Sequence, residues 1–185
     1  MMTEISLNVL DIANNSIRAE ASLIEIIIQI QRDMDKLTII IADNGCGMTK
    51  SQIEKVEDPF FTTRTTRKVG LGVPFFKMAA ESTGGSFQIE STPGVGTTVT
   101  AVFGLSHIDR MPLGDMNSTM HTLITLNTQI DFLYHYIFDD KEFTLDTREF
   151  RQILTDVPLN SPEVSAYIKE YLQENQLEVD GGYLV

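Results

Sequence analysis

Apolar residues recur with helical spacing at the start of the chain and then give way to two continuous apolar runs. Between residues 4 and 19 they return every three or four positions, which predicts a helix with one face packed on a sheet. Residues 22–31 and 37–42 are rich in β-branched side chains, as buried strands are, and residues 33–36 predict the turn between them. The predicted hairpin brings the next residue, Asp43, to the end of the sheet.

A second set of elements follows the same order of helix and hairpin. Thr49 is a helix-capping residue, and it predicts a short helix over residues 49–56. Residues 74–85 predict a longer helix that stops at a glycine pair. Residues 86–91 and 97–104 are again β-branched and aromatic, and they predict a closing hairpin whose turn contains two glycines.

The C-terminal segment, residues 105–185, contains stretches with the apolar spacing of strands and stretches with that of helices. We expect a connector over residues 106–116, because proline and glycine interrupt any regular element there. Residues 119–127 and 129–140 predict two further strands that form a hairpin, with His121 and His135 on strand faces rather than in a metal site.

Two helices are expected to follow this hairpin. They cover residues 146–156, capped by Asp146, and residues 161–176, with Ser161 as N-cap and Pro162 in the first turn. The second helix has an apolar stripe that we expect to pack on the extra strands: Val164, Ile168, Tyr171 and Leu172. Residues 178–185 are expected to be loose.

The pattern as a whole predicts an α+β fold. We expect a two-layer α/β sandwich whose mixed, mainly antiparallel sheet has helices on one face and is extended by a C-terminal hairpin and two helices. The expected division is a first domain over residues 1–104 and a C-terminal extension over residues 105–185 that packs on it. A length of 185 residues suits one domain with such an appendage.

The charge is strongly acidic and unevenly distributed. With 14 basic and 26 acidic residues the net charge is −12, which disfavours binding to nucleic acid or to an anionic membrane. Residues 1–104 carry −3 and residues 105–185 carry −9. The acidic extension either faces a basic partner or is a solvated surface. The sequence shows neither a signal peptide nor a membrane-spanning stretch, so we expect a cytoplasmic protein.

The first predicted helix has a polar face with candidate chemistry. Asp11, Asn15 and Arg18 are spaced four and three residues apart, so their side chains share one face. An amide oxygen suits magnesium, a carboxylate can orient or deprotonate a water or hydroxyl, and a guanidinium can neutralise phosphate. The alternative is an exposed polar face with an Asp–Arg contact.

The turn after the central strand, residues 43–48 with the sequence DNGCGM, is a second candidate. It holds a carboxylate at a strand end beside two glycines, which allow close backbone approach to a ligand. Asp43 can accept a hydrogen bond from an exocyclic amine such as adenine N6, although Asn-Gly turns are also common strand ends. The single cysteine, Cys46, excludes an internal disulfide, and we expect it to be a small buried residue rather than a redox-sensitive thiol.

A cationic, glycine-containing stretch over residues 57–73 is the third candidate. Hydroxyls, three cations and glycine amides precede the next helix, whose N-terminus suits phosphate. The cations are Arg64, Arg67 and Lys68, followed by Gly70 and Gly72. This predicts a phosphate-covering loop, with a basic surface loop as the alternative. In the closing hairpin, Thr97 is placed to support Asp43 through its hydroxyl or a bridging water.

Taken together, these stretches resemble the GHKL ATP-binding fold of gyrase, heat-shock chaperones, mismatch-repair ATPases and sensor histidine kinases. The sequence LDIANNSIRA at residues 10–19 resembles the N box, DNGCGM the G1 box, VGLGV the G2 box and PGVGTT the G3 box. DPFFTTR at residues 58–64 is close to the F box of the kinase branch. The resemblance covers about residues 4–104.

The resemblance implies ATP and Mg²⁺ as ligands, with Asn15 as the metal ligand, Asp43 as the adenine-reading residue and Asp11 as the catalytic group. It implies nucleotide contacts for a larger set: Asn15, Arg18, Asp43, Gly45, Gly47, Met48, Arg64, Arg67, Lys68, Gly70, Leu71, Gly72 and Thr97. Lys68 stands where the family often has the first glycine of its lid motif, and Asp11 stands where some branches have a glutamate.

Three functions stay open at this point. No phosphoacceptor-histidine helix precedes the first box, so a kinase of this kind needs a partner protein to supply the acceptor. The protein is therefore expected to be a kinase-like signal-transduction protein that acts on or with a partner. The alternatives are a slow ATPase that switches conformation and a non-catalytic module that sequesters a partner, like anti-sigma members of the superfamily.

Overall fold

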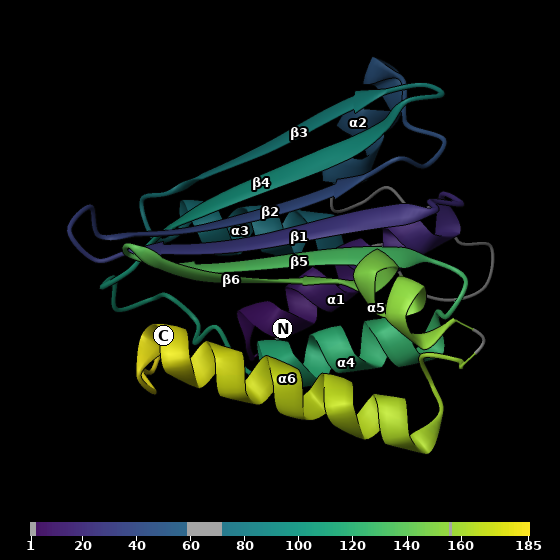
Figure 1. Cartoon of the computed structure of the whole chain (residues 1–185). Coiled ribbons are helices and arrows are strands. Elements are labelled where there is room, and N and C mark those ends of the chain that lie inside the picture. Colours follow the sequence, from purple (N-terminus) through teal and green to yellow (C-terminus); the bar gives the residue numbers. More distant parts are fainter. Residues whose placement is uncertain (1–2, 59–71, 156) are drawn as a thin grey trace.

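A single six-stranded sheet organises the molecule, with strand order β3-β4-β2-β1-β5-β6. The computed structural model describes residues 3–58, 72–155 and 157–185. The strands are β1 (Leu23–Gln31), β2 (Lys36–Asp43), β3 (Ser86–Thr92), β4 (Gly96–Gly104), β5 (Asp131–Phe138) and β6 (Lys141–Asp146). All neighbouring strands are antiparallel except β1 and β5, which run parallel (Figure 1).

Helices cover one face of this sheet. They are α1 (Ile5–Arg18), α2 (Lys50–Glu57), α3 (Gly72–Glu81), α4 (Met116–Leu126), α5 (Thr147–Leu154) and α6 (Pro162–Asp180). Alternate residues of the central strands, such as Ile24, Ile26, Ile28 and Ile30 of β1, are fully buried beneath the helices, and the residues between them are only partly buried. Helix α1 contacts α3 on one side and α4 on the other, and α4 in turn contacts α6. The predicted α+β sandwich with a mixed, mainly antiparallel sheet is confirmed.

Most of the predicted elements of residues 4–104 are present. The first helix, both hairpins and the helix after Thr49 form as expected. Thr49 and Gln52 make a capping box, in which each side chain accepts a hydrogen bond from the other residue's backbone N–H. The β1–β2 register pairs Ile24 with Asp43, so the hairpin does deliver Asp43 to the end of the sheet.

The prediction of a strand over residues 119–127 was wrong. This segment belongs to α4, which begins after Asp115, whose carboxylate accepts a hydrogen bond from the N–H of Ser118. The buried residues of α4 recur at spacings of three and four: Met116, Thr119, Met120, Leu123 and Ile124. The threonines favour a strand locally, but burial of this helical stripe against α1, α6 and β5 decides the conformation. His121 therefore lies on a helix, where its Nε2 contacts the hydroxyl of Ser165 in α6 at 2.9 Å.

The extra hairpin is consequently built from different residues. Strand β5 is the predicted one, but its hairpin partner is β6, which follows it in the chain. His135 does lie on a strand face, 2.9 Å from the carboxylate of Glu142. Because β5 also pairs with β1, the sheet is continuous between residues 1–104 and 105–185. The boundary between the two predicted units stays a prediction.

The expectation of a loose C-terminus was also wrong. Helix α6 continues to Asp180, and Gly181 closes it in the left-handed conformation. Beyond it, the ring of Tyr183 lies 5.3 Å from that of Phe138, and the carbonyl of Val185 accepts a hydrogen bond from the N–H of Leu113. The predicted α6 stripe packs as expected, with Val164, Ile168 and Leu172 buried. Among the described residues, no helix combines the length and apolar character that crossing a membrane requires.

Candidate functional site

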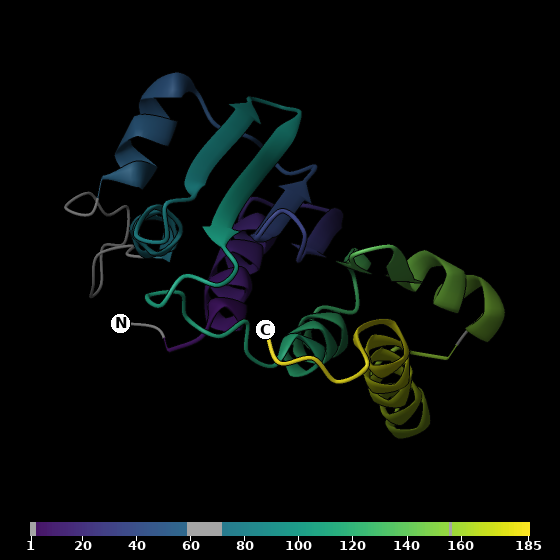
Figure 2. The ribbon, with the colours of Figure 1, turned by 90° about the vertical axis from the view of Figure 1, so that its left-hand side faces the viewer.

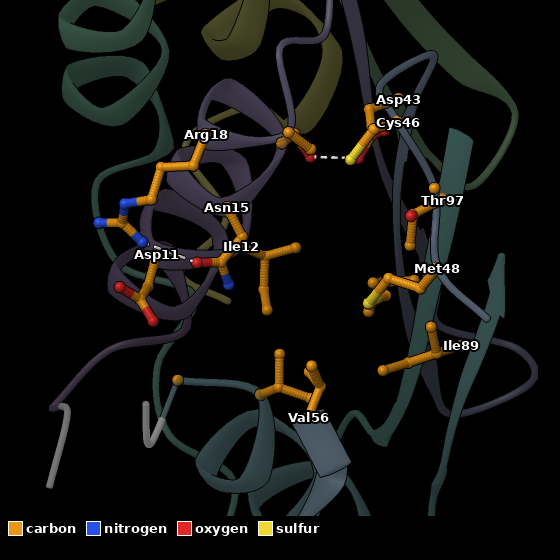
Figure 3. A pocket seen from close by; sticks show the side chains of 16 residues that line it. Asp11, Ile12, Asn15, Arg18, Asp43, Cys46, Met48, Val56, Ile89 and Thr97 are labelled. Atoms are coloured by element: carbon orange, nitrogen blue, oxygen red, sulfur yellow. Dashed lines mark hydrogen bonds between the residues drawn. The ribbon is translucent and has the colours of Figure 1, made fainter. Parts of the chain in front are cut away.

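A cavity of about 360 Å³ opens between α1, the turn after β2, α2 and the start of α3 (Figure 3). Its floor is formed by β3 and β4. It brings together eight of the predicted site residues: Asp11, Asn15, Arg18, Asp43, Gly47, Met48, Gly72 and Thr97. A volume of this size, with an apolar lining and a few polar groups, is typical of a small-molecule site.

Asp43 is held at one end of the cavity by two hydrogen bonds. The hydroxyl of Ser16 in α1 donates to its Oδ2 over 2.5 Å, and the backbone N–H of Gly45 donates to its Oδ1 over 2.9 Å. Gly45 is buried, and a Cβ there would lie 2.6 Å from the carbonyl oxygen of Ala19. The carboxylate is therefore fixed in orientation, and each of its oxygens can still accept a further hydrogen bond.

The turn itself is clamped between α1 and the β3–β4 turn. The N–H of Cys46 donates to the carbonyl of Ala19 at 2.9 Å, and the carbonyl of Cys46 accepts from the N–H of Gly94 at 2.7 Å. Gly47 has a φ of +66°, and a Cβ there would overlap the carbonyl oxygen of Thr92. Position 47 therefore needs a glycine for two reasons: its φ is positive, and a side chain would overlap the backbone of Thr92.

A pair of hydroxyls supports the neighbouring wall. Ser91 in β3 accepts a hydrogen bond from the N–H of Met48 at 2.8 Å, and its hydroxyl lies 2.8 Å from that of Thr97. Thr97 is the β4 residue opposite Asp43 in the β2–β4 register. Its hydroxyl bonds to Ser91, while Ser16 and Gly45 supply the hydrogen bonds that Asp43 receives from the described residues.

The polar face of α1 forms the other end of the cavity. Asp11, Asn15 and Arg18 all line it, and the guanidinium of Arg18 donates to Oδ1 of Asn15 over 2.8 Å. Gly72, the first residue of α3, lies directly against Asp11, since a Cβ there would overlap the Asp11 carboxylate. Figure 3 shows these side chains on the opposite side of the hollow from Met48 and Thr97. The arrangement joins α1 to the N-terminus of α3, where unpaired amides favour an anion.

The described residues contain no group of three or more His, Cys, Asp or Glu that would hold a metal ion alone. Mg²⁺ does not need such a cage, because it is commonly held by one or two protein oxygens together with phosphates and water. The exposed carboxamide of Asn15 at the cavity edge fits that requirement.

Helix α2 covers the site with little packing of its own, since none of its residues is buried. Val56 faces the cavity, and the carboxylate of Glu57 accepts a hydrogen bond from Lys77 of α3 at 2.9 Å. This hydrogen bond raises the pKa of Lys77 above its ordinary value. The remaining predicted contacts fall on residues 59–71, outside the described residues: Arg64, Arg67, Lys68, Gly70 and Leu71.

Sequence reasoning missed part of the site and misjudged one residue. Neither Ser16 nor Ser91 was singled out from the sequence, because both act through partners distant in sequence. The apolar walls come from several elements: Ile12, Val56, Val73, Ile89 and Val99. Cys46 was expected to be buried, but it is exposed at the cavity. Its backbone N–H bonds to Ala19 and its C=O to Gly94, which holds the backbone of Cys46 between α1 and the β3–β4 turn and leaves the side chain at the cavity wall.

Comparisons with known proteins agree with this geometry. Residues 3–107 match the family described as histidine kinase-, DNA gyrase B-, and HSP90-like ATPase. The signal transduction histidine-protein kinase AtoS of Escherichia coli K12 is 34% identical over 98 residues, which cover 52% of this chain and 16% of that protein. The sensor protein kinase FleS of Pseudomonas aeruginosa is 34% identical over 97 residues, which cover 52% of this chain and 24% of that protein.

The chain thus spans a small part of the length of the curated relatives that it matches. Among solved structures, the N-terminal domain of a DNA repair protein superposes with a TM-score of 0.56 at 20% identity. It covers 78% of this chain, and the match takes in 52% of that domain's chain. At this identity the likeness concerns the fold alone.

Proposed function

The chain belongs to the histidine kinase-, DNA gyrase B-, and HSP90-like ATPase family, and from this premise we propose that it is a magnesium-dependent ATP-binding protein that acts on or with a partner protein. Its GHKL ATPase domain is homologous to the ATP-binding domains of histidine kinases. The proposal adds the roles of individual residues, the use of magnesium and the dependence on a partner.

The observation that carries the proposal is the fixed orientation of the Asp43 carboxylate at the cavity. Its carboxylate is fixed by Ser16 and Gly45 at the end of a cavity that is otherwise largely apolar. A planar base fits between such walls, and an exocyclic amine can donate to the fixed carboxylate oxygen. Gly47 and Met48 border the same end of the cavity, where they would contact the base.

The polar end of the cavity supports the phosphate assignment. Asn15 would hold Mg²⁺, which when bound would neutralise phosphate charge, and Arg18 would add a cation on the same side. Arg18 now donates to Asn15 Oδ1. A metal ion on that oxygen would repel the guanidinium, which would then be free for a phosphate. The cations and glycines of residues 64–72 and Thr97 complete the proposed set of contacts.

Asp11 is the proposed catalytic group. Its carboxylate lines the cavity beside Gly72, on the phosphate side. A kinase is the first candidate, because this chain is similar to the kinases AtoS and FleS. In a kinase, the Asp11 carboxylate would help activate the acceptor group of a partner protein. The same position suits a carboxylate that orients water, so a partner-independent ATPase is the second candidate.

The binding test is titration of the protein with ATP and Mg²⁺ by calorimetry, comparing wild type with Asp43→Asn. The variant would place an amide N–H₂ or a weaker acceptor opposite the amine, and loss of a charge-assisted hydrogen bond corresponds to about 1.5–3 kcal/mol. We expect ATP affinity to fall by at least tenfold. The control, Asp33→Asn, removes an exposed carboxylate from the β1–β2 turn and should leave the ATP affinity unchanged. Equal affinities for wild type and Asp43→Asn would reject the adenine site.

The chemical test follows free phosphate and labelled protein together, using γ-labelled ATP. Phosphate release by the protein alone that Asp11→Asn abolishes would favour the ATPase. ATP binding without release or labelling is expected for a kinase that awaits its partner. Release that Asp11→Asn leaves intact would exclude Asp11 as the catalytic group.

A further inference from the structure

Helix α6 carries a stripe of glutamates along the side that faces away from the sheet. With one tyrosine among them, they follow spacings of four, three, four and four residues: Glu163, Tyr167, Glu170, Glu174 and Glu178. All five are exposed. The buried residues of α6, which include Val164 and Ile168, fix the rotation of the helix and therefore hold this stripe outward.

Nothing in the described part of the chain compensates this charge. Within it, none of the four glutamates makes an ion pair or a side-chain hydrogen bond. Lys169, the only cation of α6, is not three or four residues from any of them, so it projects elsewhere. Glu170, Glu174 and Glu178 repel one another at i, i+4 spacing. The nearby arginines Arg148 and Arg151 are already paired with aspartates, Asp146 and Asp131.

The stripe has an aromatic centre that continues onto α5. Tyr167 is 55% exposed, and its ring lies 5.9 Å from that of Phe150 and 6.3 Å from that of Tyr171. Ile153, one turn beyond Phe150 on α5, is 81% exposed.

A fifth carboxylate borders these rings. Glu149 is exposed and directly precedes Phe150 on α5. Burial raises the pKa of Tyr171 in the same cluster, and the charges of Tyr167 and Glu149 add to that shift. We refer to the combined surface as the acidic–aromatic face: Glu149, Phe150, Ile153, Glu163, Tyr167, Glu170, Glu174 and Glu178.

We propose that the acidic–aromatic face binds a basic segment of a partner protein, in which arginines or lysines pair with the glutamates and an apolar side chain covers Tyr167 and Ile153. Arginine suits this surface best, since its guanidinium both pairs with carboxylates and stacks on aromatic rings. A basic segment relieves the repulsion within the stripe. Phosphate-bearing surfaces, whether nucleic acid or anionic lipid, are repelled by it.

The position of the face allows partner and nucleotide to bind at once. Figure 2 shows α5 and α6 on the side of the molecule away from α2 and α3, which border the cavity. Between them, α4 contacts both α6 and α1, the helix that carries Asp11, Asn15 and Arg18. The inference rests on the proposed function in one respect, since it states the chemistry of the partner that this function requires.

The test uses a fluorescein-labelled synthetic peptide of arginines and leucines patterned as an amphipathic helix, with binding followed by fluorescence anisotropy at physiological salt and without ATP. We expect the combined variant Glu163→Gln, Glu170→Gln and Glu174→Gln to bind the peptide at least tenfold more weakly than wild type. We expect Tyr167→Ala, which keeps every charge, to weaken binding about threefold, a loss that net charge does not explain.

The matched control changes the net charge equally at exposed carboxylates of α2, α3 and β3, on the opposite side of the molecule from α6 (Figure 2), with Glu54→Gln, Glu81→Gln and Glu90→Gln combined. It should change peptide affinity less than twofold. Equal weakening by both combined variants, or no binding to wild type, would overturn the proposal. Circular dichroism checks that the variants are folded. Because peptide binding is measured without ATP, failure of the nucleotide assignment would leave this result unaffected, and the α6 variant should bind ATP like wild type.

Discussion

The cavity and the layer beneath β5 use polar and apolar residues in opposite ways. Around the cavity, Asp43 and Ser16 bond to each other at the edge of an open hollow. Beneath β5, Phe132, Tyr134 and Tyr136 are fully buried, and the rings of both tyrosines lie 5.8 Å from that of Phe143. One region keeps space open and holds its polar groups at the wall, whereas the other fills the space with rings.

The buried polar groups differ in the same way. The hydroxyl of Tyr136 donates to Asp180 in α6 over 2.9 Å, and Gln176 donates to the same oxygen over 3.1 Å. The first bond joins α6 to β5, and the second lies within α6 and supports the same carboxylate. The Asp43 carboxylate keeps acceptor capacity toward the cavity. The comparison teaches that the layer beneath β5 is packed for support, whereas the region around Asp43 keeps both space and hydrogen-bond acceptors available to a ligand.

The largest effect is expected from a cavity made beneath β5. Phe132 is fully buried and pairs with Ile24 of β1, so Phe132→Ala should lower the free energy of unfolding by about 3–5 kcal/mol. Urea unfolding followed by circular dichroism measures this. Ile137→Ala, on the partly exposed face of the same strand, is the control and should cost clearly less.

The Phe132→Ala variant also tests whether the layer beneath β5 and the region around the cavity unfold as one cooperative unit. Because β5 pairs with β1 and β1 with β2, we expect amides of β2 and β5 to lose protection from hydrogen exchange together. If β2 kept its protection in Phe132→Ala while β5 lost it, the two regions would unfold independently, and the comparison would describe two separate units.

A smaller effect is expected at the turn below the cavity. Gly47 and Gly94 both have positive φ, at +66° and +76°, but only at Gly47 would a Cβ collide, with the carbonyl of Thr92. Gly94→Ala should destabilise the fold by about 1–2 kcal/mol, the cost of the left-handed conformation alone. Gly47→Ala should cost about 2–4 kcal/mol, because overpacking is added.

Chemical denaturation of the two glycine variants measures the difference, and ATP titration adds a functional comparison. Since Gly47 lines the cavity, its substitution should also weaken ATP binding, whereas Gly94→Ala should not. Equal stabilities of the two variants would mean that the Gly47–Thr92 contact relaxes without cost.

The smallest effect is expected at the surface of the C-terminal segment. The hydrogen bond from Arg148, with help from the Arg148 backbone N–H, holds the pKa of Asp146 below its ordinary value. A lowered carboxyl pKa stabilises the fold above the unfolded-state value and loses that contribution as the pH falls through the folded-state value. Asp146→Asn keeps an oxygen that can cap α5 but loses the ion pair.

Thermal unfolding of wild type and Asp146→Asn as a function of pH separates the two roles. At neutral pH the variant should be slightly less stable than wild type, by less than either glycine variant. The difference should begin to shrink as the pH falls below the unfolded-state pKa of about 4, and it should vanish below the folded-state pKa. A difference that persists at low pH would assign the effect to the cap rather than to the charge.

The front of the chain could be predicted closely because its signals are local. The β-branched apolar runs of residues 22–31 and 37–42, the cap at Thr49 and the glycines at 94 and 96 each indicate an element without reference to distant residues. The segment over residues 119–127 failed for the opposite reason. Its threonines and isoleucine favour a strand, and only burial against α1, α6 and β5 makes it a helix.

The residues of the site likewise fall into those that local spacing predicts and those that depend on distant contacts. Spacing alone put Asp11, Asn15 and Arg18 on one helix face and two glycines beside Asp43. All of these residues line one cavity except Gly45, which is buried behind Asp43. The hydrogen bonds that Ser16 donates to Asp43 and that Met48 donates to Ser91 join residues far apart in the chain. The exposure of Cys46 likewise depends on such distant contacts. No pattern within a short window indicates such contacts.

The sequence by itself therefore determined the α+β class, most of the elements of residues 4–104, the acidic character of the chain and the polar residues gathered around Asp43. Hydrophobic periodicity, turn chemistry and helical spacing are properties of neighbouring residues, so they can be read along the chain. The tertiary structure decided that β5 joins β1, that α4 is a helix, that the C-terminus packs and that Cys46 faces the cavity. Those features depend on which distant surfaces are buried against each other. The free energy gained by this burial exceeds the local conformational preference of any single segment.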